Sequence, residues 1–135
     1  MDIFDEIARQ YPLTDQIAPD TELFRVMKKR FVLFRHAQID KQNIEAVLDE
    51  TKSTLERFDI PGWRTVVVVA PTEASFESEE LLYFDNVNTF IVFYLIDIQK
   101  KCVYMNDSWI FALGLNYKKI VRNINEIVKK AFLKD

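Results

Sequence analysis

The segment Phe90-Ile91-Val92-Phe93-Tyr94-Leu95-Ile96 is the longest apolar run of this 135-residue chain. It has the length of a strand, whereas a membrane-spanning helix needs about 20 apolar residues. Because strand side chains alternate between the two faces of a sheet, a run that is apolar throughout predicts a strand buried on both faces. Val66-Val67-Val68-Val69 shows the same pattern. These two runs predict the centre of a sheet covered on both faces, by helices or by one helical layer and a dimer partner.

Helical periodicity surrounds these two strands. Apolar residues recur every three or four positions over 41–58, where Asp40 is the predicted N-cap, and again over 117–133. A short helix, Trp109 to Leu113, is predicted before the last one, with Gly114 at the turn between them. The sequence therefore predicts a C-terminal helical pair.

The remaining segments complete the predicted order of elements. A helix is expected over 3–11, a connection over 12–19 and a second helix over 22–30, while 31–36 fits either a helix or a strand. The run Cys102 to Met105 predicts a strand in a hairpin with Phe90–Ile96. Helices, then strands, then helices indicate a single α+β domain over residues 1–135. We expect a small antiparallel sheet of about three to four strands, packed with N-terminal helices and the C-terminal pair.

Composition argues against several kinds of active site. The chain has two glycines, one cysteine and one histidine, so a glycine-rich phosphate loop, a disulfide framework and a multi-histidine metal site are all disfavoured. His36 and Cys102 could form a thiolate–imidazole pair, but no third group that would orient it is evident. We therefore expect no cofactor, no metal and no catalytic residues, and interpret Cys102 as a small buried side chain.

Charge is distributed unevenly along the chain, although the net charge is only −3. Residues 61–99 carry six acids and one base, and the carboxylates are densest just before the Phe90 strand. An acidic surface attracts a basic protein. We expect an inhibitor or immunity-type protein whose carboxylates occupy the phosphate-binding site of a basic, nucleic-acid-cutting partner. The residues assigned to this contact are Glu73, Glu77, Glu79, Glu80, Tyr83 and Asp85.

The basic C-terminal end supports a different interpretation. Residues 100–135 carry eight bases and three acids. The stretch Trp109–Leu113, the glycine turn and the helix that follows resemble the helix-turn-helix ending of LuxR-type regulators, over about a sixth of the chain. The resemblance implies a nucleic-acid-binding regulator, with the basic residues of the last helix facing phosphates or base edges. Those residues are Lys118, Lys119, Arg122, Lys129 and Lys130.

The N-terminal sequence bears on location. Met1-Asp2-Ile3-Phe4-Asp5-Glu6 is acidic where a secretory signal would be basic, and the single cysteine suits a reducing compartment. We therefore expect a cytoplasmic protein that does not contact membranes. A homodimer and a complex with another protein are both compatible with these features.

Overall fold

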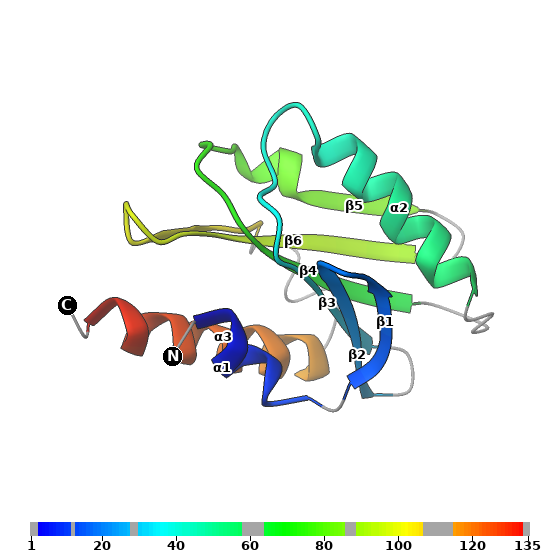
Figure 1. Cartoon of the computed structure of the whole chain (residues 1–135), viewed down its shortest axis with the longest axis horizontal. Helices are drawn as coiled ribbons and strands as arrows, with labels where there is room; N and C mark the ends of the chain where they lie inside the picture. The colour runs from blue at the N-terminus through cyan, green and yellow to red at the C-terminus, as the bar shows by residue number, and fades with distance from the viewer. Residues whose placement is uncertain are drawn as a thin grey trace.

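The centre of the molecule is one mixed sheet of seven strands (Figure 1). The computed structural model describes residues 3–11, 13–27, 30–57, 64–85, 89–106 and 115–133. Within them the helical elements are α1 (Ile3–Ala8), α2 (Ile44–Arg57), the 3-10 helix η1 (Ser78–Leu81) and α3 (Leu115–Leu133). The strands are β1 (Leu13–Ala18), β2 (Thr21–Met27), β3 (Arg30–Arg35), β4 (Arg64–Pro71), β5 (Leu82–Asp85), β6 (Thr89–Asp97) and β7 (Cys102–Tyr104).

The strand order is β1-β2-β3-β4-β6-β5, with β7 also paired to β6. The first three strands form an antiparallel meander, whereas β3, β4 and β6 run parallel to one another. β4 pairs along one edge of β6, and two short antiparallel strands share the other edge. Of these, β5 pairs with Thr89–Val92 and β7 pairs with Leu95–Asp97.

The expected sheet of three to four antiparallel strands is therefore wrong, although the fold remains α+β. Parallel neighbours need a long crossover connection, and α2 provides one between β3 and β4. The expected helix over 22–30 is wrong as well, because Thr21–Met27 is β2, and the expected connection at 12–19 contains β1. Residues 31–36, which fitted either pattern, are mostly strand β3.

The two central strands are confirmed, and so is their burial on both faces. Successive residues of β4 and β6 enter opposite cores, as the strand period requires. Val67, Val69, Val92 and Tyr94 lie in the core with α1 and α3. Val66, Val68, Ile91 and Phe93 lie in the core with α2. Helices thus cover both faces of the sheet (Figure 1).

Both long helices are confirmed with shifted starts. Asp40 fixes the entry to α2, because its Oδ1 accepts the N–H groups of Gln42 at 2.8 Å and Asn43 at 2.9 Å. α3 begins at Leu115 and buries Ile120, Val121, Ile124 and Val128 against the sheet. The expected short helix Trp109–Leu113 and the Gly114 turn lie outside the described residues. The predicted hairpin of β6 and β7 is confirmed.

Candidate functional site

The acidic segment before β5 is held in place by two buried apolar side chains. Phe76 and Leu81 enter the core beneath α2, and their exposed fractions are 8% and 1%. The carboxylates between and beside them face solvent. These exposed residues are Glu73, Glu77, Glu79 and Glu80. Tyr83 is half-buried in β5, while Asp85 ends that strand and its side chain lies outside the described residues.

Lys41 ties this acidic segment to the loop that precedes α2. Its Nζ donates to Glu80 Oε2 and lies 4.7 Å from the centre of the Phe76 ring. Glu80 Oε2 also accepts the N–H of Glu77 at 2.8 Å. The hydrogen bond from Lys41, followed by that from Glu77, lowers the pKa of the Glu80 carboxyl below its ordinary value. Glu80 therefore has a structural partner, whereas the side chains of Glu73, Glu77 and Glu79 face solvent, although Glu77 also caps η1 in a capping box with Glu80.

Replacing Lys41 with methionine tests this assignment, because the variant keeps the aliphatic stem and removes the charge. We expect the Glu80 pKa to rise towards its ordinary value, measured by carbon-detected NMR titration of the carboxyl group. Because the folded-state pKa is lowered, the stability that Glu80 contributes is present at neutral pH and lost as pH falls through that pKa. Lys52→Met is the matched control and leaves the Glu80 pKa in place. An unchanged pKa in K41M would show that Lys41 is not its cause.

The exposed carboxylates of α2 lie on the same side of the sheet as this acidic segment. α2 and the 76–81 segment pack on one side of the sheet in a shared core. α2 also contacts β5, the strand that follows this segment, because Lys52 Nζ lies 4.1 Å from the centre of the Tyr83 ring. We call the exposed carboxylates of both elements the acidic face. It consists of Glu45, Asp49, Glu50, Glu56, Glu73, Glu77, Glu79 and Glu80.

Of the acidic face, the sequence predicted only the carboxylates from Glu73 to Glu80. The α2 carboxylates lie in the predicted helix over 41–58, but whether that helix covers the same face of the sheet as Glu77 and Glu79 cannot be read from the sequence. The signal that could have found them is the charge count, since residues 40–60 hold six acids and three bases.

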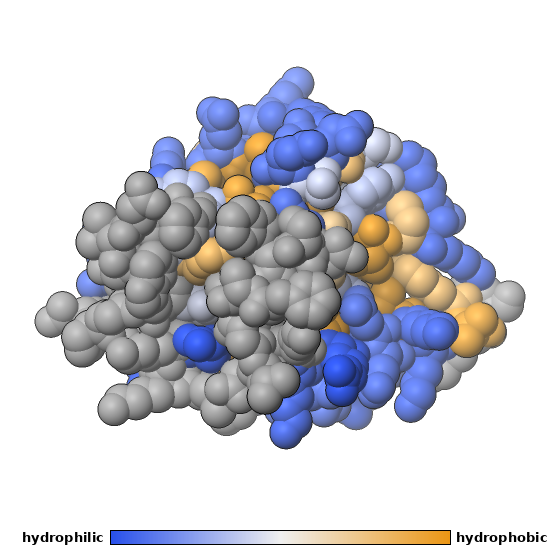
Figure 2. All heavy atoms as spheres, turned by 180° about the vertical axis from the view of Figure 1, so that it is seen from behind, coloured by the Kyte–Doolittle hydropathy of each residue, from blue (hydrophilic) through white to orange (hydrophobic). Residues whose placement is uncertain are grey.

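The basic residues of α3 lie on the opposite side of the sheet. Lys119, Arg122, Lys129 and Lys130 are exposed, while the Lys118 side chain lies outside the described residues. Figure 2 shows hydrophilic side chains along the upper margin of the molecule and again along its lower margin, where α3 lies. Since α2 and α3 pack on different faces of the sheet, the acidic face and the basic side of α3 point away from each other.

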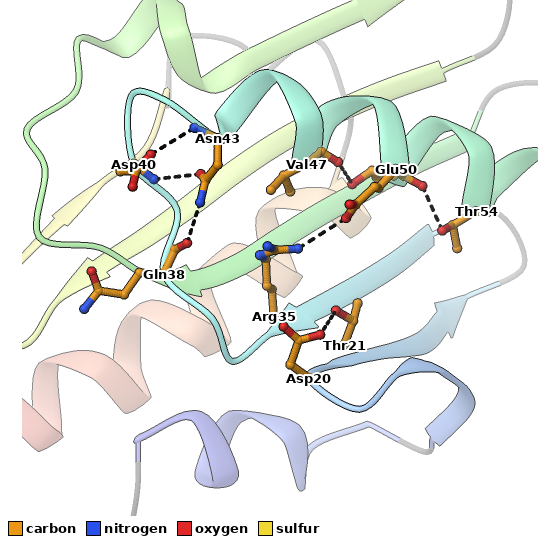
Figure 3. A network of polar contacts seen from close by, with 10 residues as sticks. Asp20, Thr21, Arg35, Gln38, Asp40, Asn43, Val47, Glu50 and Thr54 are labelled. Atoms are coloured by element: carbon orange, nitrogen blue, oxygen red, sulfur yellow. Dashed lines mark hydrogen bonds and ion pairs between the residues drawn. The ribbon is translucent and has the colours of Figure 1, made fainter.

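A cavity of about 570 Å³ lies between α2 and the first three strands, and we call it the α2 groove. Figure 3 shows Arg35 reaching from β3 towards Glu50 on α2, with Asp20 and Thr21 below. Arg35 Nη1 lies 3.3 Å from Glu50 Oε2. The groove is lined by Ile17, Ala18, Asp20, Thr21, Leu33, Arg35, Val47, Asp49, Glu50, Thr51, Ser53, Thr54 and Arg57.

The structure places His36 and Cys102 apart. His36 follows β3, and its Nε2 lies 2.6 Å from Glu22 Oε1. Cys102 begins β7, so β4 and β6 stand between the two strands. Three strand spacings correspond to roughly 14 Å, too far for a thiolate–imidazole hydrogen bond. Cys102 is also half-buried, whereas a buried side chain was expected.

Comparison with known proteins identifies no family for this chain. No protein-family model matches the sequence, and no curated protein is significantly similar to it. Within the described ranges, no group of three or more histidine, cysteine, aspartate or glutamate side chains is arranged to hold a metal ion. Among the helices that the structure describes, none combines the length and apolar character needed to cross a membrane.

Proposed function

We propose that this protein binds a basic protein partner through its acidic face and performs no chemistry of its own. The most concrete form of the proposal is an inhibitor or immunity-type protein. In that role its carboxylates would occupy the phosphate-binding site of a nucleic-acid-cutting partner, where they take the place of the substrate's phosphates. The cytoplasm is the proposed location, because such a partner would act there.

One observation supports this proposal above the others. Two acidic segments that are separate in the sequence lie on the same side of the sheet, because α2 and the 76–81 segment share a core there. The exposed bases of α3 lie on the other side. A molecule with opposite charges on its two sides turns its acidic side towards a basic partner during approach, which raises the association rate.

The acidic face is also pre-organised. Leu81 and Phe76 anchor its later half in the core, and Glu80 is held by Lys41. A surface that is already ordered loses less conformational entropy when a partner binds. Glu73, Glu77 and Glu79 are therefore presented on a fixed backbone.

Charge reversal of these three residues is the direct test. We expect E73K/E77K/E79K to lower the association rate constant for the captured partner by at least about tenfold and to remove most of its salt dependence. The partner is first captured from lysate on the immobilised wild-type chain, and its association is then followed by surface plasmon resonance. Glu80 stays unchanged because its replacement would also break the contact with Lys41.

The matched control reverses three charges on the other side of the molecule. We expect K119E/R122E/K129E to bind the same partner at a rate close to that of the wild type. If E73K/E77K/E79K binds as well as the wild type, or if only the α3 variant loses binding, the acidic face is not the contact.

Nucleic-acid binding by α3 is the second proposal, and the exposure of four bases on one helix favours it. Its test is the mobility of duplex DNA at several salt concentrations. A regulator is expected to retard the DNA at low salt, with a salt slope that falls by about one for each phosphate-contacting base removed. Absence of retardation at low salt would reject this alternative.

A further inference from the structure

We propose that the α2 groove binds an arginine or lysine side chain on an extended segment of the basic partner. This inference rests on the proposed function and names the part of the partner that the molecule would recognise. Three features of the groove carry it: apolar walls, an aspartate with little internal pairing, and an arginine short of hydrogen-bond acceptors.

The walls of the groove suit the aliphatic stem of a long side chain. Leu33 and Val47 line the groove but are only 3% and 2% exposed, so they form its apolar floor, and the half-buried Ile17 provides the apolar surface that a stem can contact. The volume of about 570 Å³ is within the range of sites that enclose small ligands. Arginine and lysine bury their methylene stems against such surface while the charged head reaches a polar group.

The carboxylates of the groove differ in how far they are already paired. Glu50 faces Arg35, and Arg57 is drawn to Asp15, where Nη2 and Oδ2 are 3.8 Å apart. Asp20, in the turn between β1 and β2, accepts only the Thr21 hydroxyl at 3.0 Å among the side-chain contacts of the described residues. Asp20 therefore has acceptor capacity left for an incoming cation.

Asp49 is a second carboxylate that could accept a cation, and it also belongs to the acidic face. It lines the groove from α2, and its nearest basic partner, Lys52, is 3.8 Å away with the Asp49 side chain 79% exposed. A surface pair of this kind is weak and easily exchanged for another cation. The groove is thus continuous with the surface that is proposed to attract the partner.

Arg35 is the residue of the groove that would contact the backbone of the partner's segment. Its side chain is only 17% exposed, and its Nε is buried without an acceptor among the described residues. Nη1 has a single long contact, with Glu50. A buried N–H that lacks an acceptor is costly, and a peptide carbonyl oxygen near Nε would supply one without adding negative charge to the groove.

The test uses amino-acid probes and the full chain, so it does not require the partner. N-acetyl-arginine methylamide is titrated into the ¹⁵N-labelled protein, and backbone amide shifts are followed by NMR. We expect shifts at Thr21, Glu50 and Thr54, with a dissociation constant on the order of 1 mM. N-acetyl-citrulline methylamide has the same shape without the charge, and N-acetyl-glutamate methylamide carries the opposite charge.

A substitution within the groove makes the test specific. Asp20→Asn keeps an acceptor for Thr21, and we expect it to weaken arginine-probe binding by about fivefold. Asp49→Asn provides a second variant. Glu126→Gln removes one exposed carboxylate from α3, on the other side of the sheet and outside the groove lining, and is expected to bind the probe as the wild type does. Thermal unfolding of each variant checks that it is folded.

Each other outcome overturns the inference. Equal binding of the citrulline probe would mean that the groove does not recognise the cation, and tighter binding of the glutamate probe would make it an anion site of Arg35. Absence of shifts at the groove, or wild-type binding by both aspartate variants, would also reject it. These failures are distinct from failure of the proposed function, whose test changes only Glu73, Glu77 and Glu79, outside the groove.

Discussion

Replacing Phe93 with alanine is expected to lower the free energy of unfolding by about 3–5 kcal/mol. Phe93 lies in the middle of β6, is 1% exposed and belongs to the core beneath α2. Truncating it removes apolar contacts and leaves a cavity. The surrounding side chains cannot easily fill this cavity, because the backbone hydrogen bonds between β4 and β6 hold them in place. Urea denaturation followed by circular dichroism measures the loss as a lower midpoint with an unchanged slope.

The matched control is an apolar residue that the fold leaves in solvent. Leu133, at the end of α3, is 76% exposed, and Leu133→Ala is expected to change the free energy of unfolding by less than about 0.5 kcal/mol. Similar effects of the two substitutions would contradict the assignment of β6 to the centre of the core.

Replacing Tyr94 with phenylalanine is expected to alter the response of stability to alkaline pH. Tyr94 is fully buried in β6, its hydroxyl donates to Asn125 Oδ1 on α3, and burial raises its pKa above the ordinary value of about 10. The neutral form is therefore favoured in the folded state. The stability of the wild type stays constant with respect to this group below about pH 10, and falls by about 1.4 kcal/mol per pH unit above it.

The two stability curves should cross. At neutral pH the variant loses the hydrogen bond to Asn125 and is expected to be less stable by about 1 kcal/mol. Above about pH 11 it becomes the more stable protein, because it has no hydroxyl to ionise. Tyr11, whose pKa burial also raises, is present in both proteins and cancels. Parallel curves from pH 7 to 12 would mean that Tyr94 ionises as freely in the folded as in the unfolded state.

The sequence correctly predicts those elements whose pattern of apolar residues fits only one kind of secondary structure. Every position of Phe90–Ile96 is apolar, which suits a strand buried on both faces. The spacing of apolar residues over 117–133 likewise fits only a helix. Residues 22–30 were predicted to be a helix and 31–36 fitted either pattern, because Leu23, Met27, Phe31 and Phe34 are spaced as on a helix. The pairing of β2 with β3 decides between them and places Leu23 and Phe24 in opposite cores.

The candidate site likewise has residues that the local sequence predicts and residues that only the fold brings together. Local charge density identified Glu73 to Glu80, whose exposure follows from their own sequence. The α2 groove was not identified, because Asp20 and Arg35 lie in different segments of the sequence, and neither was among the predicted site residues. Their meeting depends on the β2–β3 register, which sets Thr21 opposite Arg35, and on α2 crossing above. No short segment of the sequence contains that information.

The parallel centre of the sheet also constrains how the chain reaches its native state. Val67 lies opposite Val32 and Val92, and each of these partners is separated from it by a long intervening segment. The meander of β1, β2 and β3 forms by local closure, whereas β4 acquires neighbours only after much longer loops have closed. Until then its row of valines stays available to other chains, so the yield of refolding should fall as protein concentration rises.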